Sequence, residues 1–182
     1  MQMPSHDVVI DDTRRWLTRA VIGLNLCPFA KAVEVKQQIR FVVSDATDAE
    51  GVVQDLAREL EFLAEADPEA VDTTLLMLPV ALADFMDFND FLDVADALLV
   101  ELQLDGILQV ADFHPDYQFA DAEPDDVANC TNRAPYPTLH LLREASIDRA
   151  VEAFPDAADI YETNIRTLRA LGAEGWKKLL TD

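Results

Sequence analysis

Lysine and arginine are scarce in this chain, with 14 among 182 residues against 35 Asp and Glu, which gives a formal net charge of −21 at pH 7. Binding to nucleic acid or to an anionic membrane surface needs a basic face, which this composition does not supply. Glycine is also rare, with 5 residues. No glycine-rich phosphate loop and no G-x-S-x-G motif occurs, so the sequence argues against the common nucleotide-binding and serine hydrolase designs.

Cysteines and long apolar runs are few as well. Cys27 and Cys130 are too few for a disulfide framework and form no C-x-x-C pair, so we expect two free thiols. No apolar stretch approaches the roughly 20 residues of a membrane-spanning helix, and the N-terminal segment is acidic where a secretory signal is cationic. We therefore expect a soluble cytoplasmic protein that binds neither nucleic acid nor membranes, with residues 1–6 frayed.

The acidic residues are concentrated in the middle of the chain. No Lys or Arg lies between Arg58 and Arg133, an interval that holds more than half of the Asp and Glu residues. Two hypotheses fit this pattern: a hydrated acidic surface suited to high salt, or a docking surface for a cationic protein partner. The cations that follow, Arg133 and Arg143, are candidates to bind an anion, because a guanidinium offers a bidentate fork.

Hydrophobic periodicity predicts a single α/β domain over residues 1–182. Apolar residues at helical spacing predict helices near 7–23, 48–66, 88–102, 146–154 and 157–171, with a last turn around Trp176. Short apolar runs predict strands at 39–43, 73–79, 107–113 and 138–142. Because strands and helices alternate, we expect a small sheet of about four strands, mostly parallel, flanked by amphipathic helices.

The segment 114–137 is polar and punctuated by prolines, and we expect a functional loop with one helical turn near 125–128. Ligands of α/β sheets bind beyond the carboxyl ends of the strands. His114 and Tyr117 follow the third predicted strand, and Arg143 ends the fourth. The sequence thus predicts titratable and cationic groups at one edge of the sheet.

Four residues are candidates for catalysis. His114, aided by Tyr117, is a general acid or base, or else a histidine that caps the end of a strand. His140 alternates with leucines and is either a second acid–base group or a core histidine held by hydrogen bonds. Cys27 is a reserve nucleophile if a histidine reaches it, and otherwise a buried, inert thiol.

The candidates for binding the substrate are Asn132, Arg133, Tyr136 and Arg143. Both arginines have an alternative as ion-pair partners of nearby acidic residues, Glu144 or Asp148, and Tyr136 either packs in the core or forms the wall of a pocket. The leading hypothesis is a small enzyme that acts on an anionic small molecule by acid–base chemistry. This hypothesis predicts that Arg133, His114 and His140 converge in one pocket.

Two other functions stay open. One is a non-catalytic binding or adaptor module that uses the acidic surface. The other is a metal-binding protein, although no H-x-x-x-H spacing supports it. The ligand set for a metal would be Cys27, His114 and His140 with one of Asp112, Asp116 or Asp121. The sequence identifies no cofactor.

Three segments carry a resemblance to a known family. They are residues 23–30 (GLNLCPFA), 113–119 (FHPDYQF) and 131–144 (TNRAPYPTLHLLRE). Over nearly its whole length the chain resembles an uncharacterised bacterial family, domain of unknown function 1415. The resemblance implies that these motifs are the family's shared segments, and it implies no reaction or cofactor.

Overall fold

The computed structural model describes residues 2–154, 156 and 159–181. Its strands are β1 (Ile39–Val43), β2 (Thr73–Met77), β3 (Leu108–Phe113) and β4 (Thr138–Arg143). Its α-helices are α1 (His6–Trp16), α2 (Ala30–Val35), α3 (Ala49–Glu65), α4 (Phe85–Glu101), α5 (Glu144–Ala153) and α6 (Ile160–Thr181). A π-helix, η1 (Leu17–Ile22), continues α1, and a 3-10 helix, η2 (Val127–Asn132), lies in the long loop.

The four predicted strands are all present, with ends that differ by at most two residues. The sequence missed α2, whose six residues are too short for a clear helical pattern. Gly172, where φ is 74° and ψ is 168°, interrupts α6, so the element consists of two helical segments. This break agrees with the predicted helix end at 171 and the predicted last turn around Trp176. The predicted start of the last helix at 157, and the separating proline at 155, lie outside the described residues.

The sheet is mixed, with strand order β1-β2-β4-β3. Strands β1 and β2 are parallel, whereas β4 is antiparallel to both of its neighbours, so the prediction of a mostly parallel sheet is wrong. The physical reason is the segment 114–137. It contains no helix that crosses a face of the sheet, and the chain re-enters beside β3 with Thr138 opposite Phe113.

The reversed direction of β4 places two predicted site residues at opposite ends of the strands. His114 follows the carboxyl end of β3, while Arg143, at the carboxyl end of β4, pairs with Leu108 at the start of β3. The prediction that both groups lie at the same end of the strands is therefore wrong.

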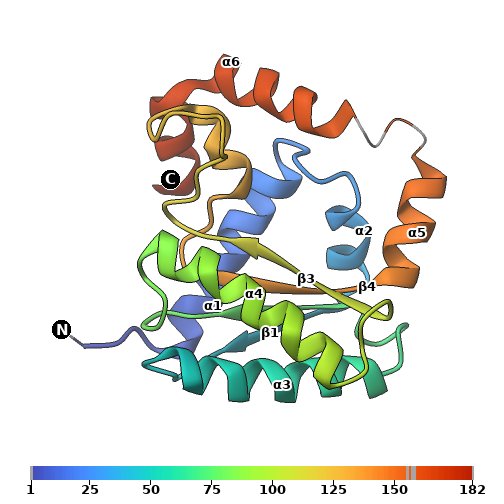
Figure 1. Ribbon diagram of the computed structural model, residues 1–182. Helices are drawn as coiled ribbons and strands as arrows, with labels where there is room; N and C mark the ends of the chain where they lie inside the picture. The colour runs from blue at the N-terminus through green and yellow to red at the C-terminus, as the bar shows by residue number, and fades with distance from the viewer. Residues whose placement is uncertain (1, 155, 157–158, 182) are drawn as a thin grey trace.

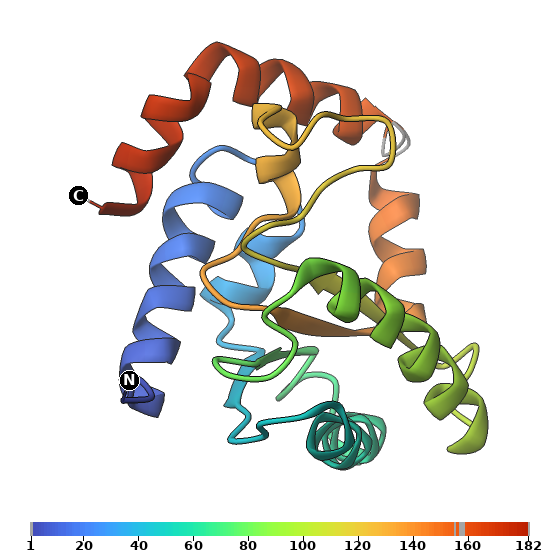
Figure 2. The same cartoon turned by 60° about the vertical axis from the view of Figure 1, so that its left-hand side comes forward.

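Helices cover both faces of the sheet (Figure 1). On one face, α3 and α4 pack a large apolar core that includes Leu56, Leu76, Phe88 and Leu139. On the other face, α1 and η1 place Trp16 and its neighbours near the sheet, and α2 and α5 lie beside them. Figure 2 shows α6 and the loop with η2 stacked at the far side of this second layer. Among the described helices, none combines the length and the apolar character that crossing a membrane requires.

Candidate functional site

Two cavities lie on the face of the sheet that α1 and η1 cover. The α1–α6 cavity, of about 340 Å³, lies between α1, α6 and the loop that precedes β4. The α2–α5 cavity, of about 330 Å³, lies between the sheet, η1, α2 and α5. Trp16 belongs to the walls of both. Their polar residues differ, and with them the chemistry that each cavity permits.

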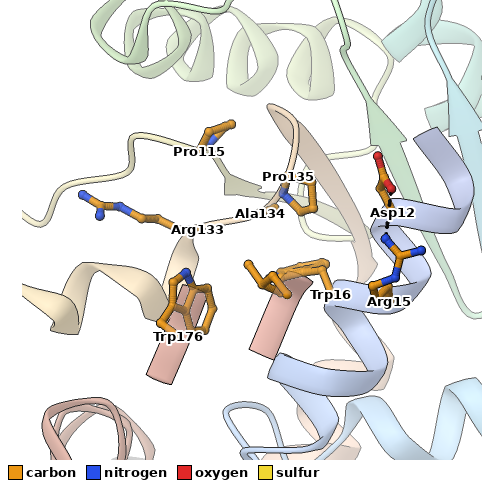
Figure 3. A pocket seen from close by; sticks show the side chains of 9 residues that line it. Asp12, Arg15, Trp16, Pro115, Arg133, Ala134, Pro135 and Trp176 are labelled. Atoms are coloured by element: carbon orange, nitrogen blue, oxygen red, sulfur yellow. Dashed lines mark hydrogen bonds and ion pairs between the residues drawn. The ribbon is translucent and has the colours of Figure 1, made fainter. Parts of the chain in front are cut away.

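The α1–α6 cavity contains two arginines that do not converge (Figure 3). Arg15 points toward Asp12, with Nη1 3.3 Å from the carboxylate. Arg133 extends away from both, and its Nε and Nη2 donate to the carbonyl oxygens of Tyr117 and Pro124 at 3.0 and 2.9 Å. Because these donors already hold neighbouring groups, the arginines form no shared fork for an anion.

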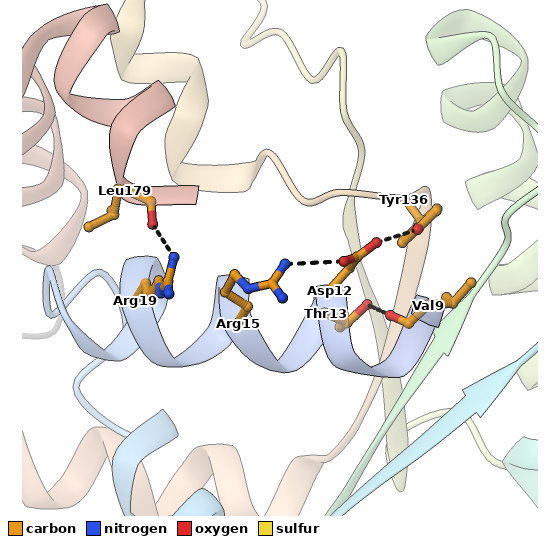
Figure 4. A network of polar contacts seen from close by, with 7 residues as sticks. All are labelled: Val9, Asp12, Thr13, Arg15, Arg19, Tyr136 and Leu179. Carbon is orange, nitrogen blue, oxygen red and sulfur yellow. Dashed lines mark hydrogen bonds and ion pairs between the residues drawn. The ribbon is translucent and has the colours of Figure 1, made fainter. Parts of the chain in front are cut away.

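Tyr136 is held by the same acidic side chain (Figure 4). Its hydroxyl donates to Asp12 Oδ2 at 2.6 Å, which ties the approach to β4 to helix α1. Burial and the Asp12 carboxylate raise the pKa of Tyr136 to about 12. The tyrosine therefore stays protonated near neutral pH and acts as a link between two segments. Arg19, one turn beyond Arg15, similarly reaches the Leu179 carbonyl of α6 at 3.3 Å.

His114 is buried, and both of its ring nitrogens have partners. Nδ1 accepts from the Asp116 backbone N–H at 3.0 Å, so the proton lies on Nε2, which donates to the Leu82 carbonyl at 3.1 Å. The rings of Phe85 and Phe88 lie 5.3 and 5.0 Å away, and burial lowers the pKa of His114. This geometry favours the alternative of a structural histidine at the end of a strand.

The other predicted residues of the long loop gather around His114 and hold the loop together. The backbone N–H of His114 donates to the Asn132 carbonyl at 3.1 Å, and the Arg133 side chain donates to the Tyr117 carbonyl. The Tyr117 ring packs on Phe85, and burial raises the pKa of its hydroxyl. The structure thus brings His114, Tyr117, Asn132 and Arg133 together, but their polar atoms stabilise the loop.

Arg143 caps the end of another element. Its Nη2 donates to the carbonyl oxygens of Val71 and Ala66, at 2.8 and 3.2 Å, in the turn that joins α3 to β2. Within the described residues it forms no ion pair with Glu144 or Asp148. The predicted convergence of Arg133, His114 and His140 is also wrong, because Arg133 lines the α1–α6 cavity, His140 lines the α2–α5 cavity, and His114 lines neither.

The α2–α5 cavity has apolar walls and one cluster of polar groups. Its walls come from η1, α2, α5 and one face of the sheet, and include Trp16, Phe29, Ile39, Phe113, Leu142 and Ile147. The polar groups that line it are Cys27, Asp72, Thr73, His140 and Ser146. An apolar enclosure with a few convergent polar groups is the usual form of a small-molecule site.

His140 lies on β4 opposite Leu75 of β2, on the sheet face that forms the floor of this cavity. Burial lowers its pKa to about 4, against a smaller opposing effect of the Asp72 carboxylate. The ring is therefore neutral at pH 7. No protein group among the described residues hydrogen-bonds either ring nitrogen, so the imidazole keeps a donor and an acceptor for a ligand.

Asp72 and Ser146 complete the polar cluster, and sequence reasoning missed both. Ser146 Oγ donates to Asp72 Oδ1 at 2.6 Å. Thr73, beside Asp72, uses its hydroxyl to donate to the Leu141 carbonyl at 2.6 Å. Asp72 precedes a strand and Ser146 lies in a helix, 74 positions apart, so no local pattern joins them. Only the pairing of β2 with β4 brings them together.

Cys27 lines the same cavity as His140. Burial raises the pKa of its thiol, although the backbone N–H groups of Phe29 and Ala30 oppose the shift. The resting side chain is thus a protonated thiol, which is a poor nucleophile. Cys27 and His140 therefore lie in one site. The raised pKa of the thiol favours a role for Cys27 in the wall of the cavity over a role as a nucleophile.

In the segment before Cys27, a backbone carbonyl approaches Gly23 too closely to leave room for a side chain. The N–H of Gly23 donates to the Thr18 carbonyl and that of Leu26 to the Val21 carbonyl, both five residues back, as in a π-helix. A Cβ at Gly23 would lie 2.2 Å from the Arg19 carbonyl oxygen. The widened turn carries the chain to Cys27 and α2, which explains the physical role of the motif at 23–30.

The described part of the chain contains no group of three or more His, Cys, Asp or Glu side chains that could hold a metal ion. The sequence pattern of one protein family, described as Protein of unknown function (DUF1415), matches residues 8–178. No curated protein and no solved structure matches the chain.

Proposed function

The chain belongs to the DUF1415 family, and we propose that it binds a small apolar molecule with one polar end in the α2–α5 cavity, where His140 forms a hydrogen bond with that end. One observation carries the proposal. An apolar cavity of about 330 Å³ lies over a histidine whose ring nitrogens have no protein partner in the described chain. Ligand pockets in proteins have this size and this distribution of apolar and polar groups.

The protonation state of His140 sets the hydrogen bonds that it can make. Since its pKa is about 4, the ring is neutral at pH 7, so one nitrogen donates a hydrogen bond and the other accepts one from a bound hydroxyl, thiol or ammonium group. A ring with this pKa is a weak base, so it holds the polar end of the ligand by hydrogen bonds. The Asp72 carboxylate raises the pKa of the ring and so opposes the larger effect of burial.

Occupation of the cavity can be tested with N-phenyl-1-naphthylamine, a neutral apolar fluorophore with one N–H donor. We expect saturable binding with one site per chain. Ala150, on α5, lines the cavity, so Ala150→Phe fills it and should abolish binding. The matched control is Ala145→Phe, because Ala145 is exposed on the same helix. Equal binding by both variants would overturn the proposed site.

The role of His140 needs its own comparison. His140→Leu keeps an apolar residue of similar size but removes both nitrogens, so the fluorophore should bind about ten-fold more weakly, the loss of one hydrogen bond to a neutral partner. His6→Leu is the control, since His6 is exposed on α1. Unchanged affinity in His140→Leu would remove His140 from the proposal.

A second candidate function, docking of a cationic protein, has support from α4. Five aspartates at every third position, Asp84, Asp87, Asp90, Asp93 and Asp96, are exposed. Replacing Asp90, Asp93 and Asp96 by Asn should abolish capture of a Lys/Arg-rich partner if this surface docks one. The fluorophore should still bind this variant, which separates the two candidate functions.

A further inference from the structure

We propose that the polar end of the α2–α5 cavity selects an organic cation, namely a protonated amine on an aromatic or aliphatic body. This inference rests on the proposed function, because it names the ligand class for the same site. Three features of the cavity favour a cation: the charge that lines it, the hydrogen-bonding capacity of His140, and the aromatic walls.

Asp72 is the one charged side chain that lines the cavity within the described residues. Its Oδ1 accepts from the neutral Ser146 hydroxyl, and no Lys or Arg of the described chain forms an ion pair with it. Two arginines lie nearby, but Arg143 donates to the carbonyls of Val71 and Ala66, and Arg149 donates to Ser146 Oγ at 3.2 Å. The carboxylate therefore forms no ion pair within the described residues, although Arg143 lies close enough for the two charges to interact.

An ammonium group at this end would find complementary groups. The Asp72 carboxylate supplies the opposite charge, and the neutral His140 ring supplies an acceptor. Trp16, Phe29 and Phe113 line the same cavity, and the faces of aromatic rings attract cations. The net charge of −21 also raises the local concentration of cations around the protein.

An anionic ligand would meet the opposite conditions. Its charge would be removed from water beside a carboxylate, with apolar walls and no lining cation in the described chain to compensate. A neutral alcohol of the same shape would keep the apolar contacts and one hydrogen bond. The site should therefore rank the three charge types as amine, then alcohol, then carboxylate.

The test compares 4-phenylbutylamine, 4-phenylbutanol and 4-phenylbutyrate by titration calorimetry on the unmodified protein at pH 7. We expect the amine to bind at least ten-fold more tightly than the alcohol, and the carboxylate to show no measurable heat. In Asp72→Asn the amine should lose this advantage while the alcohol keeps its affinity within two-fold. Asp148→Asn, an exposed change on α5, should leave all three affinities unchanged.

The alcohol guards against a general loss of structure in Asp72→Asn, because it needs the same apolar walls but no carboxylate. An unchanged far-UV circular dichroism spectrum of Asp72→Asn is a second, independent check of its fold. Alcohol affinity equal to or above that of the amine in the unmodified protein would overturn the inference and leave the proposed function intact. Failure of all three compounds and of the fluorophore to bind would overturn both.

Discussion

Ser146 donates a 2.6 Å hydrogen bond to Asp72 and so ties the first turn of α5 to the segment that precedes β2. This contact matters because α5 has no fully buried residue of its own. Most of what the helix contributes to the fold is the apolar wall of the α2–α5 cavity, through Ile147 and Ala150 among others. Stability of α5 and the shape of the cavity are therefore coupled.

This coupling predicts the effect of Ser146→Ala. Loss of a hydrogen bond to a carboxylate should lower the free energy of unfolding by about 1–2 kcal/mol in urea denaturation. Amide hydrogen exchange should accelerate in α5 and leave α3 unaffected. Faster exchange spread evenly over the molecule would contradict the coupling.

Gly23 provides a second prediction. A Cβ there would lie 2.2 Å from a backbone oxygen, so Gly23→Ala should destabilise the fold by about 2 kcal/mol or more and displace the η1 wall of the cavity. Gly106→Ala is the control, because Gly106 has φ of 79° but nothing within 4 Å of the added atom. It should cost about 1 kcal/mol. The fluorophore should bind Gly106→Ala normally and Gly23→Ala weakly; normal binding by both would contradict this account.

The lowered pKa of His140 predicts how stability depends on pH. The unfolded chain, with a histidine pKa near 6.5, binds the proton more readily than the folded one, whose pKa is about 4. The contribution of His140 to stability is thus fully present above pH 6.5 and is lost as pH falls toward 4. His140→Gln should remove on the order of 2–3 kcal/mol of the difference in unfolding free energy between pH 7 and pH 4. If urea denaturation gives His140→Gln the same difference in unfolding free energy between pH 7 and pH 4 as the unmodified protein, His140 is not desolvated.

Salt provides a fourth prediction. Raising the NaCl concentration from about 0.1 to 1 M shortens the Debye length from about 10 to 3 Å, which screens repulsion among the acidic residues. With a net charge of −21, the protein should melt at a higher temperature in the higher salt. The melting temperature should rise less with salt in the variant in which Asn replaces Asp90, Asp93 and Asp96. A melting temperature that falls with salt would mean that the acidic residues mainly form attractive pairs.

The strands could be predicted because each is a short apolar run that the chain has to bury. Leu75, Leu76 and Met77 are all buried, as the continuous run in β2 indicates. The direction of β4 could not be predicted, because it depends on where the long loop packs. That packing, of η2 against α6, joins segments far apart in the sequence.

The candidate site was predictable in residue type but not in arrangement. His114 looked reactive because titratable residues surround it in the sequence, yet its partner is the Leu82 carbonyl, 32 residues away. His140 could be placed on one face of a strand from its alternation with leucines. Strand pairing and helix packing place Asp72 and Ser146 beside that face. Neither produces a local pattern in the sequence.

An NMR titration of the three histidine side chains with N-phenyl-1-naphthylamine tests the proposed site most directly. His6 is exposed, His114 is held by backbone groups, and His140 lines the α2–α5 cavity, so each reports a different environment. We predict that the imidazole resonances of His140 shift in step with binding while those of His6 and His114 stay in place. Saturable binding that leaves the His140 resonances unmoved would contradict the proposed site.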